Sequence, residues 1–380
     1  MGRSHCDVLV IGGGAVGLST AWWLAPSRPV VLLERFEPAH HRGASHGEER
    51  IFRYLYSDLA YVEMARAADD GWQRLERDAG RRLLHRVGSV EHGDDTELGA
   101  MAAAADASGV PYERLAAGDA NRRWPAMHFA SDVLLQPTAG WVRAAEALQS
   151  LAGQAAAAGV ELRFDAPVSA VEALDGGDGV RVEVGDETYH ADVVVVTAGA
   201  WATSLLPRVP LPPLLTTEEH VFFFRFAPDG PGATGRYRLS GAGQAESASI
   251  LSFLHVHDCV RYGLEGPSGL VKIGEHHTGT VTTGDERTDA FDPERAARME
   301  RYVAEWLPGL APEAVSSATC LYTSTPTHDF VLDRVGPVVV GAGFSGHGFK
   351  FVPEIGRRLA MLATGAADPD PRFAIEAHRR

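Results

Sequence analysis

The first 36 residues constrain the fold of this chain more than any other stretch. Residues 7–11 form an apolar, largely β-branched run that is typical of a fully buried parallel strand. A glycine-rich stretch, residues 12–17, separates this run from a helical segment that extends to residue 24. A second apolar run at residues 30–33 completes a strand–helix–strand unit. The sequence therefore predicts a parallel sheet with a glycine-rich turn between its first strand and its first helix.

Three glycines stand where a dinucleotide-binding turn requires them. Gly12 permits the tight turn, Gly14 lets a pyrophosphate approach the backbone, and Gly17 lets the helix pack closely on the strand. The following helix offers free N–H groups and a partial positive charge to phosphates. Glu34 comes about twenty residues later, where an acidic residue binds ribose hydroxyls. The alternative interpretation is a glycine-rich turn in some other α/β protein.

Glu34 also indicates which dinucleotides fit. Its negative charge would repel a 2′-phosphate, so NAD and FAD both remain candidates. The position of the fingerprint at the start of the chain favours a flavin that the enzyme holds permanently.

Length, charge and cysteine content exclude several other classes. A chain of 380 residues is long enough for two domains, and its net charge of −15 argues against nucleic acid as a partner. No run of about twenty apolar residues indicates a membrane span. The N-terminal apolar run lacks the basic region and cleavage site of a signal peptide. Cys6, Cys259 and Cys320 are too scattered for a disulfide framework or a zinc site, so we expect a cytoplasmic location.

The rest of the chain is predicted to alternate between helices, buried strands and half-buried strands. The predicted helices are residues 61–80, 100–107, 143–158, 293–307 and one that begins at Pro353. Further predicted strands are residues 160–164, 180–184, 189–199 and 338–341, of which the runs 193–196 and 338–341 are predicted to be buried. The predicted half-buried antiparallel strands are residues 221–226, 248–254, 260–264 and 270–275. The run 193–196 should return to the nucleotide-binding sheet, so the binding domain is expected to be discontinuous.

Two further segments carry candidate functional residues. Residues 40–53 are polar without apolar periodicity and predict a loop that enters a helix or strand near Arg50. On a helix, Arg50 and Arg53 would lie on one side of the turn, whereas the alternative is a solvated, charged loop. Residues 341–350 form a second glycine-rich strand-to-helix turn, which would bring Lys350 to the cofactor from the other side.

Five motifs in order along the chain resemble the amine-oxidising flavoenzymes of the D-amino-acid-oxidase superfamily. The closest likeness is to the monomeric sarcosine oxidase and N-methyltryptophan oxidase group, which includes pipecolate-type oxidases. The motifs lie at residues 45–53, 262–263, 272–276, 319–323 and 343–350. The resemblance implies an α/β fold with a Rossmann-like, glutathione-reductase-type FAD-binding domain formed by residues 1–82, 143–212 and 320–380. It also implies an α+β substrate domain built on an antiparallel sheet, formed by residues 83–142 and 213–319.

The resemblance implies FAD bound covalently through a thioether from Cys320 to the flavin 8α-methyl group. Taken by itself, Cys320 is a small apolar residue in a strand. The cofactor-binding residues that the resemblance implies are Gly12, Gly14, Ala15, Val16, Gly17, Glu34, Arg35, Ser45, His46, Arg50, Val168, Ala198, Gly199, Trp201, Cys320, Gly343, Phe344, Gly346, His347, Gly348 and Lys350.

The resemblance also implies roles in the reaction. Lys272 corresponds to the lysine that activates oxygen, where a fixed cation stabilises developing negative charge. His46 and Arg50 would lie beside the flavin, and Arg53 and Lys350 would bind the substrate carboxylate. The residues expected to line the pocket are Tyr262, His276, Tyr322 and His347.

The implied reaction is oxidation of a secondary or cyclic amino acid by FAD and O2, giving an imine and hydrogen peroxide. The substrate would be an N-methyl amino acid such as sarcosine or a pipecolate- or proline-like acid, and the enzyme would be a monomer. The alternatives are a dehydrogenase of the same fold that uses a protein or quinone acceptor, a NAD-dependent dehydrogenase, and a non-catalytic flavin-binding or tRNA-modifying protein.

Two departures from the group's usual pattern bear on the substrate. Glu48 and Glu49 stand where the group usually has Asp-Thr, and Leu264 and Glu265 stand where it has Phe-Pro, in a loop one residue shorter.

Overall fold

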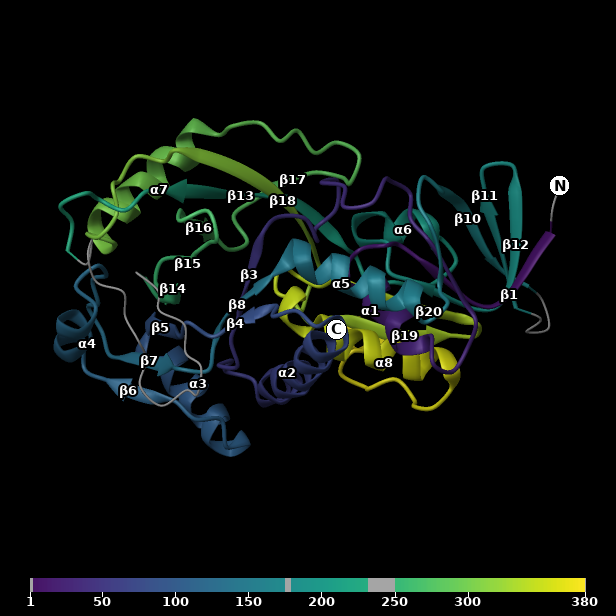
Figure 1. Ribbon diagram of the computed structural model, residues 1–380, viewed down its shortest axis with the longest axis horizontal. Coiled ribbons are helices and arrows are strands. Elements are labelled where there is room, and N and C mark those ends of the chain that lie inside the picture. The colour runs from purple at the N-terminus through teal and green to yellow at the C-terminus, as the bar shows by residue number, and fades with distance from the viewer. Residues whose placement is uncertain (1–2, 175–178, 232–249, 380) are drawn as a thin grey trace.

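The computed structural model describes residues 3–174, 179–231 and 250–379, which form an elongated body with one large sheet in each half (Figure 1). The first sheet has β1 (Arg3–Ile11) at its centre, paired in parallel with β12 on one side and β2 on the other. The other strands of this sheet are β2 (Val30–Leu33), β9 (Glu161–Arg163), β10 (Val168–Ala173), β11 (Val180–Val184), β12 (Glu187–Val196), β19 (Val331–Val335) and β20 (Val338–Ala342). β12 returns beside β1, as the sequence predicts.

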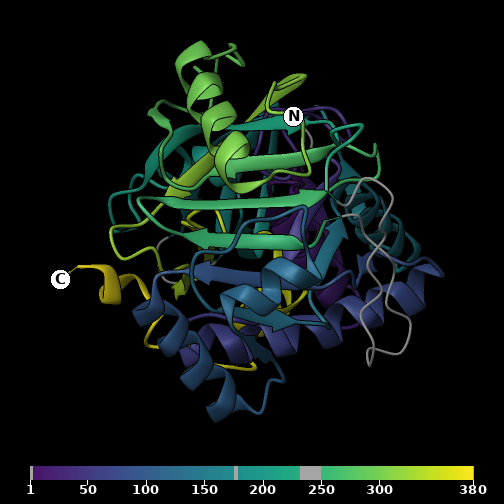
Figure 2. The same cartoon turned by 90° about the vertical axis from the view of Figure 1, so that its left-hand side faces the viewer.

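The second large sheet has the order β17-β13-β16-β15-β14-β5-β7-β6, with β18 paired to β13 (Figure 2). Its strands are β5 (Ser89–Gly93), β6 (Glu113–Leu115), β7 (Val133–Gln136), β13 (Leu215–Phe224), β14 (Ser252–Val256), β15 (Val260–Glu265), β16 (Val271–Glu275), β17 (Thr280–Val281) and β18 (Ser316–Ser324). β5 and β14 pair in parallel, and this pairing joins two stretches of sequence that are far apart.

A small third sheet lies between the two large ones. It consists of β3 (Glu49–Phe52), β8 (Gly140–Arg143) and β4 (Leu84–His85), in that order. β3 pairs antiparallel with β8, so Arg50 lies on a strand. Of the helix or strand predicted near Arg50, the structure has the strand, because pairing with β8 holds this backbone extended; the placement of Arg50 and Arg53 on one side of a helical turn therefore does not apply.

Helices cover the first sheet and flank the second. Their bounds are α1 (Ala15–Leu24), α2 (Leu59–Ala79), α3 (Asp95–Ser108), α4 (Ala117–Arg123), α5 (Ala144–Ala157), α6 (Ala202–Leu205), α7 (Pro293–Trp306) and α8 (Val352–Thr364), with 3-10 turns η2 (Gly199–Trp201), η3 (Phe349–Phe351) and η4 (Ile375–His378). Within the described ranges, no helix is long and apolar enough to cross a membrane.

The predicted amphipathic helices form where local capping supports them. The Asp58 side chain caps α2 by accepting a hydrogen bond from the Ala60 amide at 2.9 Å, and Gly80 ends the helix with φ of +61°. The Asp292 side chain accepts hydrogen bonds from the first amides of α7. The predicted stripe of α2, which includes Trp72 and Leu75, is fully buried.

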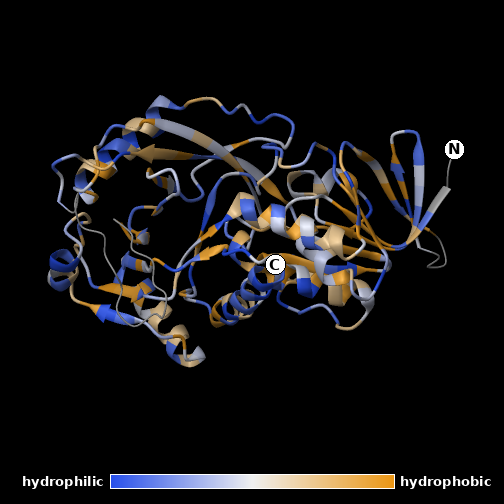
Figure 3. Ribbon diagram, viewed as in Figure 1, coloured by the Kyte–Doolittle hydropathy of each residue, from blue (hydrophilic) through white to orange (hydrophobic). Residues whose placement is uncertain are grey.

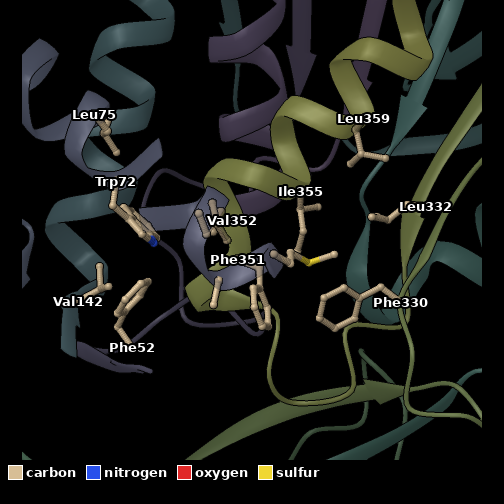
Figure 4. Packing of buried hydrophobic residues seen from close by; sticks show 14 of the residues in the cluster. Phe52, Trp72, Leu75, Val142, Phe330, Leu332, Phe351, Val352, Ile355 and Leu359 are labelled. Atoms are coloured by element: carbon tan, nitrogen blue, oxygen red, sulfur yellow. The ribbon is translucent and has the colours of Figure 1, made fainter. Parts of the chain in front are cut away.

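The main core lies between α2, α8 and the first sheet. Trp72 and Leu75 of α2 face Val352 and Ile355 of α8 (Figure 4). The C-terminal parts of β1 (residues 8–11) and β12 (residues 193–196) and the whole of β20, in the middle of this half, are apolar (Figure 3). A separate core lies under the second sheet, against α4 and α7.

Two predicted boundaries differ from those of the strands. The predicted strand at residues 248–254 begins at Ser252, and residues 248 and 249 lie outside the described residues. β18 pairs along its whole length with β13, so the predicted domain boundary between residues 319 and 320 crosses a strand of the second sheet. The division into two domains remains a proposal.

Candidate active site

The glycine-rich turn after β1 has the close approaches that its sequence predicts. Gly12 has φ of +104°, which favours glycine. A Cβ on Gly17 would lie 1.9 Å from the Gly12 carbonyl oxygen, so helix and turn could not pack with any side chain there. The amide of Ala15, at the start of α1, donates to the Ser45 hydroxyl at 3.0 Å, and Gly14 gives the helix no side-chain cap. Apart from the Ala15 amide, the N–H groups of this first turn have no side-chain cap and are available to an anion.

Glu34 lies directly after β2 and is buried. Its carboxylate accepts hydrogen bonds from the Gly13 amide at 2.5 Å and the Phe36 amide at 3.0 Å. Burial alone would raise its pKa, but hydrogen bonds from His40 and the Gly13 amide hold the pKa of Glu34 below its usual range. An ionised carboxylate at this place is suited to accept hydrogen bonds from ribose hydroxyls.

Two cavities with shared walls bring the predicted site residues together. The smaller cavity, about 640 Å³, adjoins the glycine-rich turn, Glu34 and Trp201. The larger cavity, about 800 Å³, lies between the first sheet and one face of the second. Ala15, Val16 and His46 line both. Every residue that the sequence predicts for the site lines one of the two cavities, except Gly17, which lies beneath the turn.

Strand register explains how distant residues reach the larger cavity. Tyr262 pairs with Gly274 across β15 and β16, and Leu264 pairs with Lys272. Because side chains alternate along a strand, Tyr262 and Lys272 share one face of the sheet. On β18, Cys320 and Tyr322 also line the cavity.

Lys272 forms a buried ion pair at the cavity wall. Its Nζ lies 3.0 Å from a carboxylate oxygen of Glu49 and donates to the Glu49 backbone carbonyl at 2.7 Å. Burial lowers the pKa of Lys272, and the Glu49 carboxylate opposes that effect.

Arg53 and Lys350 are two cations joined through Tyr56, of which Lys350 is buried and Arg53 is half-buried. Lys350 Nζ donates to the Tyr56 hydroxyl at 2.8 Å and to the His347 carbonyl at 3.0 Å. The Arg53 guanidinium lies 4.1 Å from the centre of the Tyr56 ring, and its Nη1 is buried without a hydrogen-bond partner in the described structure. Within the described ranges neither cation has an acidic group at ion-pair distance, although the buried Glu91 carboxyl is near enough to Arg53 for the Arg53 charge to oppose the rise of the Glu91 pKa on burial. Burial, followed by the charge of Arg53, lowers the pKa of Lys350 well below its usual value.

The segment before β3 is held by two arginines. Arg50 donates to the carbonyls of His46, Glu49 and Ala44. Arg287 Nη1 lies 3.1 Å from His46 Nε2, and its Nη2 donates to the Thr319 carbonyl, next to Cys320. Burial and these two arginines lower the pKa of His46 to about 3, so the imidazole is neutral at neutral pH.

The tyrosines and histidines of the cavity form one contact network. The Tyr322 hydroxyl lies 3.5 Å from the Tyr262 hydroxyl and 3.2 Å from His276 Nδ1. Burial lowers the pKa values of His276 and His347 well below the usual value, so both rings are neutral. A Cβ on Gly346 would lie 2.2 Å from the Tyr322 ring, so this glycine of the second turn makes room for the aromatic side chain.

Two residues in contact with the predicted site carried no functional prediction: Tyr56, which lines the larger cavity, and Arg287, which contacts His46. No local sequence signal marks Tyr56 or Arg287. A compositional signal did exist for the two lysines: the chain has 35 lysines and arginines, and only Lys272 and Lys350 are lysines. Both line the larger cavity, so this composition alone could have selected them.

The two cavities together fit a flavin dinucleotide. The smaller one has the phosphate-accepting helix start and the ribose-accepting Glu34, and the larger one opens from it at Ala15 and Val16. Fold and site thus define a dinucleotide-dependent oxidoreductase with cationic groups around its reaction cavity.

Comparisons with known proteins identify the family within this class of oxidoreductases. Residues 7–362 match the family model of FAD dependent oxidoreductases, and the chain belongs to that family. It is 32% identical over 378 residues to a monomeric sarcosine oxidase of Streptomyces avermitilis, covering 96% of this chain and 95% of that protein. It is 28% identical over 374 residues to an N-methyl-L-tryptophan oxidase of Yersinia pestis, covering 96% of each. The solved structure of NikD, an unusual amino acid oxidase essential for nikkomycin biosynthesis, superposes with a TM-score of 0.81 at 28% identity, covering 98% of this chain and 97% of that one.

Proposed function

We propose that this FAD-dependent oxidoreductase oxidises a secondary or cyclic amino acid, either an N-methyl amino acid such as sarcosine or a pipecolate- or proline-like acid. The products would be an imine and hydrogen peroxide. The names of the relatives support an amino acid as substrate. The observation that carries the proposal is the pair of the buried Lys350 and the half-buried Arg53, which line the cavity without an ion-pair partner in the described structure. A substrate carboxylate would supply the missing negative charge.

The residues of the chain divide the work around the substrate. Arg53 and Lys350 would bind the carboxylate, and Tyr56 would hold the two cations in register. Bound FAD supplies the redox chemistry, accepting electrons from the substrate and passing them to oxygen. Lys272 would place a positive charge where oxygen is reduced. Because the substrate amine must be unprotonated to be oxidised, activity should rise with pH.

We also propose a thioether between Cys320 and FAD. In support, the Cys320 thiol lies on β18 at the larger cavity, 3.7 Å from the Ala44 carbonyl of the segment that lines both cavities. The flavin colour of wild-type protein should stay with the polypeptide after acid precipitation, and Cys320→Ala should release free FAD. Wild-type colour in the supernatant would show that the linkage is absent.

Oxygen uptake by the purified protein tests the main proposal. A panel of N-methyl and cyclic amino acids should include one that drives oxygen consumption with equal formation of hydrogen peroxide. The matched esters, which lack the carboxylate, should be poor substrates. Reduction of a dye without oxygen uptake would instead identify a dehydrogenase that uses a protein or quinone acceptor.

Three coarser properties complete the proposal. We propose a cytoplasmic location, which fits the three unpaired cysteines of the described structure. We propose a monomer, for which light scattering should give a mass near the 40.7 kDa of the polypeptide. We also propose that residues 1–82, 143–212 and 320–380 form the FAD-binding domain and that the remaining residues form the substrate domain.

A further inference from the structure

Glu49 makes the one acidic contact with a lysine at the larger cavity within the described ranges. Its carboxylate is 3.0 Å from Lys272 Nζ, and both residues are nearly inaccessible, at 3% and 7% exposure. The backbone carbonyl of Glu49 accepts a second hydrogen bond from the same ammonium. The two residues are 223 positions apart in sequence, so only the fold brings β3 against β16.

A glycine in the turn between β15 and β16 admits this carboxylate. A Cβ on Gly266 would lie 3.1 Å from one oxygen of Glu49 and 3.4 Å from the other. The turn is closed by hydrogen bonds from the Gly266 amide to the Leu270 carbonyl and from the Gly269 amide to the Gly266 carbonyl. The two places where the sequence departs from its relatives' pattern, around Glu49 and around Leu264, therefore meet at one spot.

We propose that Glu49 is a positioning residue that fixes the ammonium of Lys272 at the cavity wall in its charged form, and that Gly266 makes room for it. The other lysine of the chain, Lys350, is equally buried but has hydroxyl and carbonyl partners in place of a carboxylate. The two lysines thus differ in whether their charge is balanced by the protein itself.

The groups around Lys272 determine in which direction its pKa moves when Glu49 is removed. Burial disfavours the charged ammonium, and the charge of Arg50 on β3 acts the same way. Glu49 acts against both, and the Cys320 sulfur on β18, which we propose to be bound to FAD as a thioether, would carry no charge in the holoenzyme. The strand partners of Lys272 on β13 and β15 are the apolar Phe223 and Leu264. Removal of the Glu49 charge should therefore make Lys272 lose its proton at a lower pH.

The chain's two lysines allow a direct test that needs no turnover. Holoenzyme labelled with [ε-13C]lysine should show two side-chain signals, which Lys272→Met and Lys350→Met assign. In Glu49→Gln, the pKa of Lys272 should fall by about one to three pH units, and that of Lys350 should stay unchanged. Glu48→Gln is the matched control, because it removes the adjacent, exposed carboxylate and should leave the Lys272 titration as in wild type.

Gly266→Ala tests the same contact with both charged partners present. Its added methyl group should displace the Glu49 carboxylate and shift the Lys272 pKa in the same direction by a smaller amount. An unchanged Lys272 titration in Glu49→Gln and in Gly266→Ala would overturn the proposal.

The effect of Glu49 on the reaction rests on the proposed role of Lys272 with oxygen, and a kinetic measurement tests that role separately from the contact between the two residues. If Lys272 acts on oxygen, flavin reoxidation in Glu49→Gln should decline at a lower pH than in wild type, with anaerobic reduction by substrate largely preserved. A shifted Lys272 titration with an unchanged reoxidation profile would support the positioning role of Glu49 and overturn the oxygen role of Lys272.

Discussion

The four cations that line the larger cavity differ in how their charge is balanced. Arg50 donates to three backbone carbonyls, and Lys272 pairs with a carboxylate. Arg53 and Lys350 have Tyr56 between them and no acidic group within ion-pair distance in the described structure. Lys350 is buried without a carboxylate partner, and an uncompensated buried charge is costly, so this second pair is the place where an anionic ligand gains most.

Arg53→Ala should therefore weaken substrate binding. We expect the apparent affinity for the amino acid to fall at least about 30-fold, because truncating one partner of a buried charge pair costs roughly 2 kcal/mol or more. Steady-state kinetics against substrate concentration measure this. Arg66→Ala is a suitable control, because Arg66 contacts the Ser108 carbonyl on the outer side of α2. An unaltered KM in Arg53→Ala and also in Lys350→Ala would rule out carboxylate binding at this pair.

Glu91 predicts a pH-dependent stability. Burial raises its pKa to about 7 from 4.5, against the opposing charge of Arg53. Because the folded protein binds this proton more tightly than the unfolded chain does, Glu91 makes its full contribution to stability below pH 4.5, the pKa in the unfolded chain. That contribution is lost as the pH rises through about 7, the pKa in the folded protein. The change amounts to roughly 3 kcal/mol. Glu91→Gln cannot ionise, so its stability relative to wild type should be greater at pH 8 than at pH 4.5.

Urea unfolding at the two pH values measures this difference. Glu63→Gln, on the exposed side of α2, should show no such change between them. Equal pH dependence in wild type and Glu91→Gln would show that Glu91 is ionised at little cost in the folded protein.

At the scale of elements, the site is built from backbone turns that exclude side chains. The turn from β1 to α1 and the turn after β20 both need glycine, because their neighbours lie where a Cβ would stand. In the first turn the obstacle is the Gly12 carbonyl, and in the second it is the ring of Tyr322 at Gly346. A backbone carbonyl cannot move aside by changing a rotamer, as a side chain can. Replacement of glycine should therefore be tolerated less well in the first turn than in the second.

Gly17→Ala should therefore separate α1 from the turn and lower flavin content. The Cβ would lie 1.9 Å from the Gly12 carbonyl oxygen, and such overpacking costs about 1–3 kcal/mol or more. The ratio of flavin to protein absorbance and the melting temperature measure the effect. Gly153→Ala in α5 is the matched control, because nothing lies within 4 Å of its Cβ position. That variant should gain about 0.5–1 kcal/mol from reduced backbone entropy. Full flavin content in Gly17→Ala would contradict the assigned packing role.

At the scale of the whole molecule, the cofactor site joins the two halves. The smaller cavity is lined mainly by the first sheet and its loops, whereas the larger one has walls from β13, β15, β16 and β18 of the second sheet. A ligand that fills both cavities would bind residues from both sheets, and these residues lie together only in the folded protein. Its binding should therefore stabilise the molecule as a whole.

The Cys320→Ala variant, stripped of flavin, provides the test. Added FAD should raise its melting temperature in a concentration-dependent way. At a free FAD concentration of one hundred times the dissociation constant, the free energy of unfolding should rise by about 2.7 kcal/mol. Riboflavin, which lacks the adenosine diphosphate portion, should give a much smaller shift because it cannot engage the start of α1 or Glu34. Equal shifts with both ligands would mean that the smaller cavity contributes nothing to binding.

The sequence by itself determined the local units of this protein. The apolar run before Gly12, the three glycines and Glu34 predicted a strand–turn–helix–strand unit, and β1, α1 and β2 lie there. Alternation predicted the strands around Lys272, and the periodicity of Trp72 and Leu75 predicted the buried side of α2. These features follow from neighbours in the chain, since strand and helix periods and turn sterics act over a few residues.

Only the tertiary structure decided which side chains meet in the cavity. Arg50 lies on a strand because β8, from a distant part of the chain, pairs with it. Glu49 reaches Lys272, and Arg287 reaches His46, across more than two hundred residues. Such contacts depend on the order and register of strands in three sheets, which are set by the packing of the whole chain and leave no periodic trace around either partner.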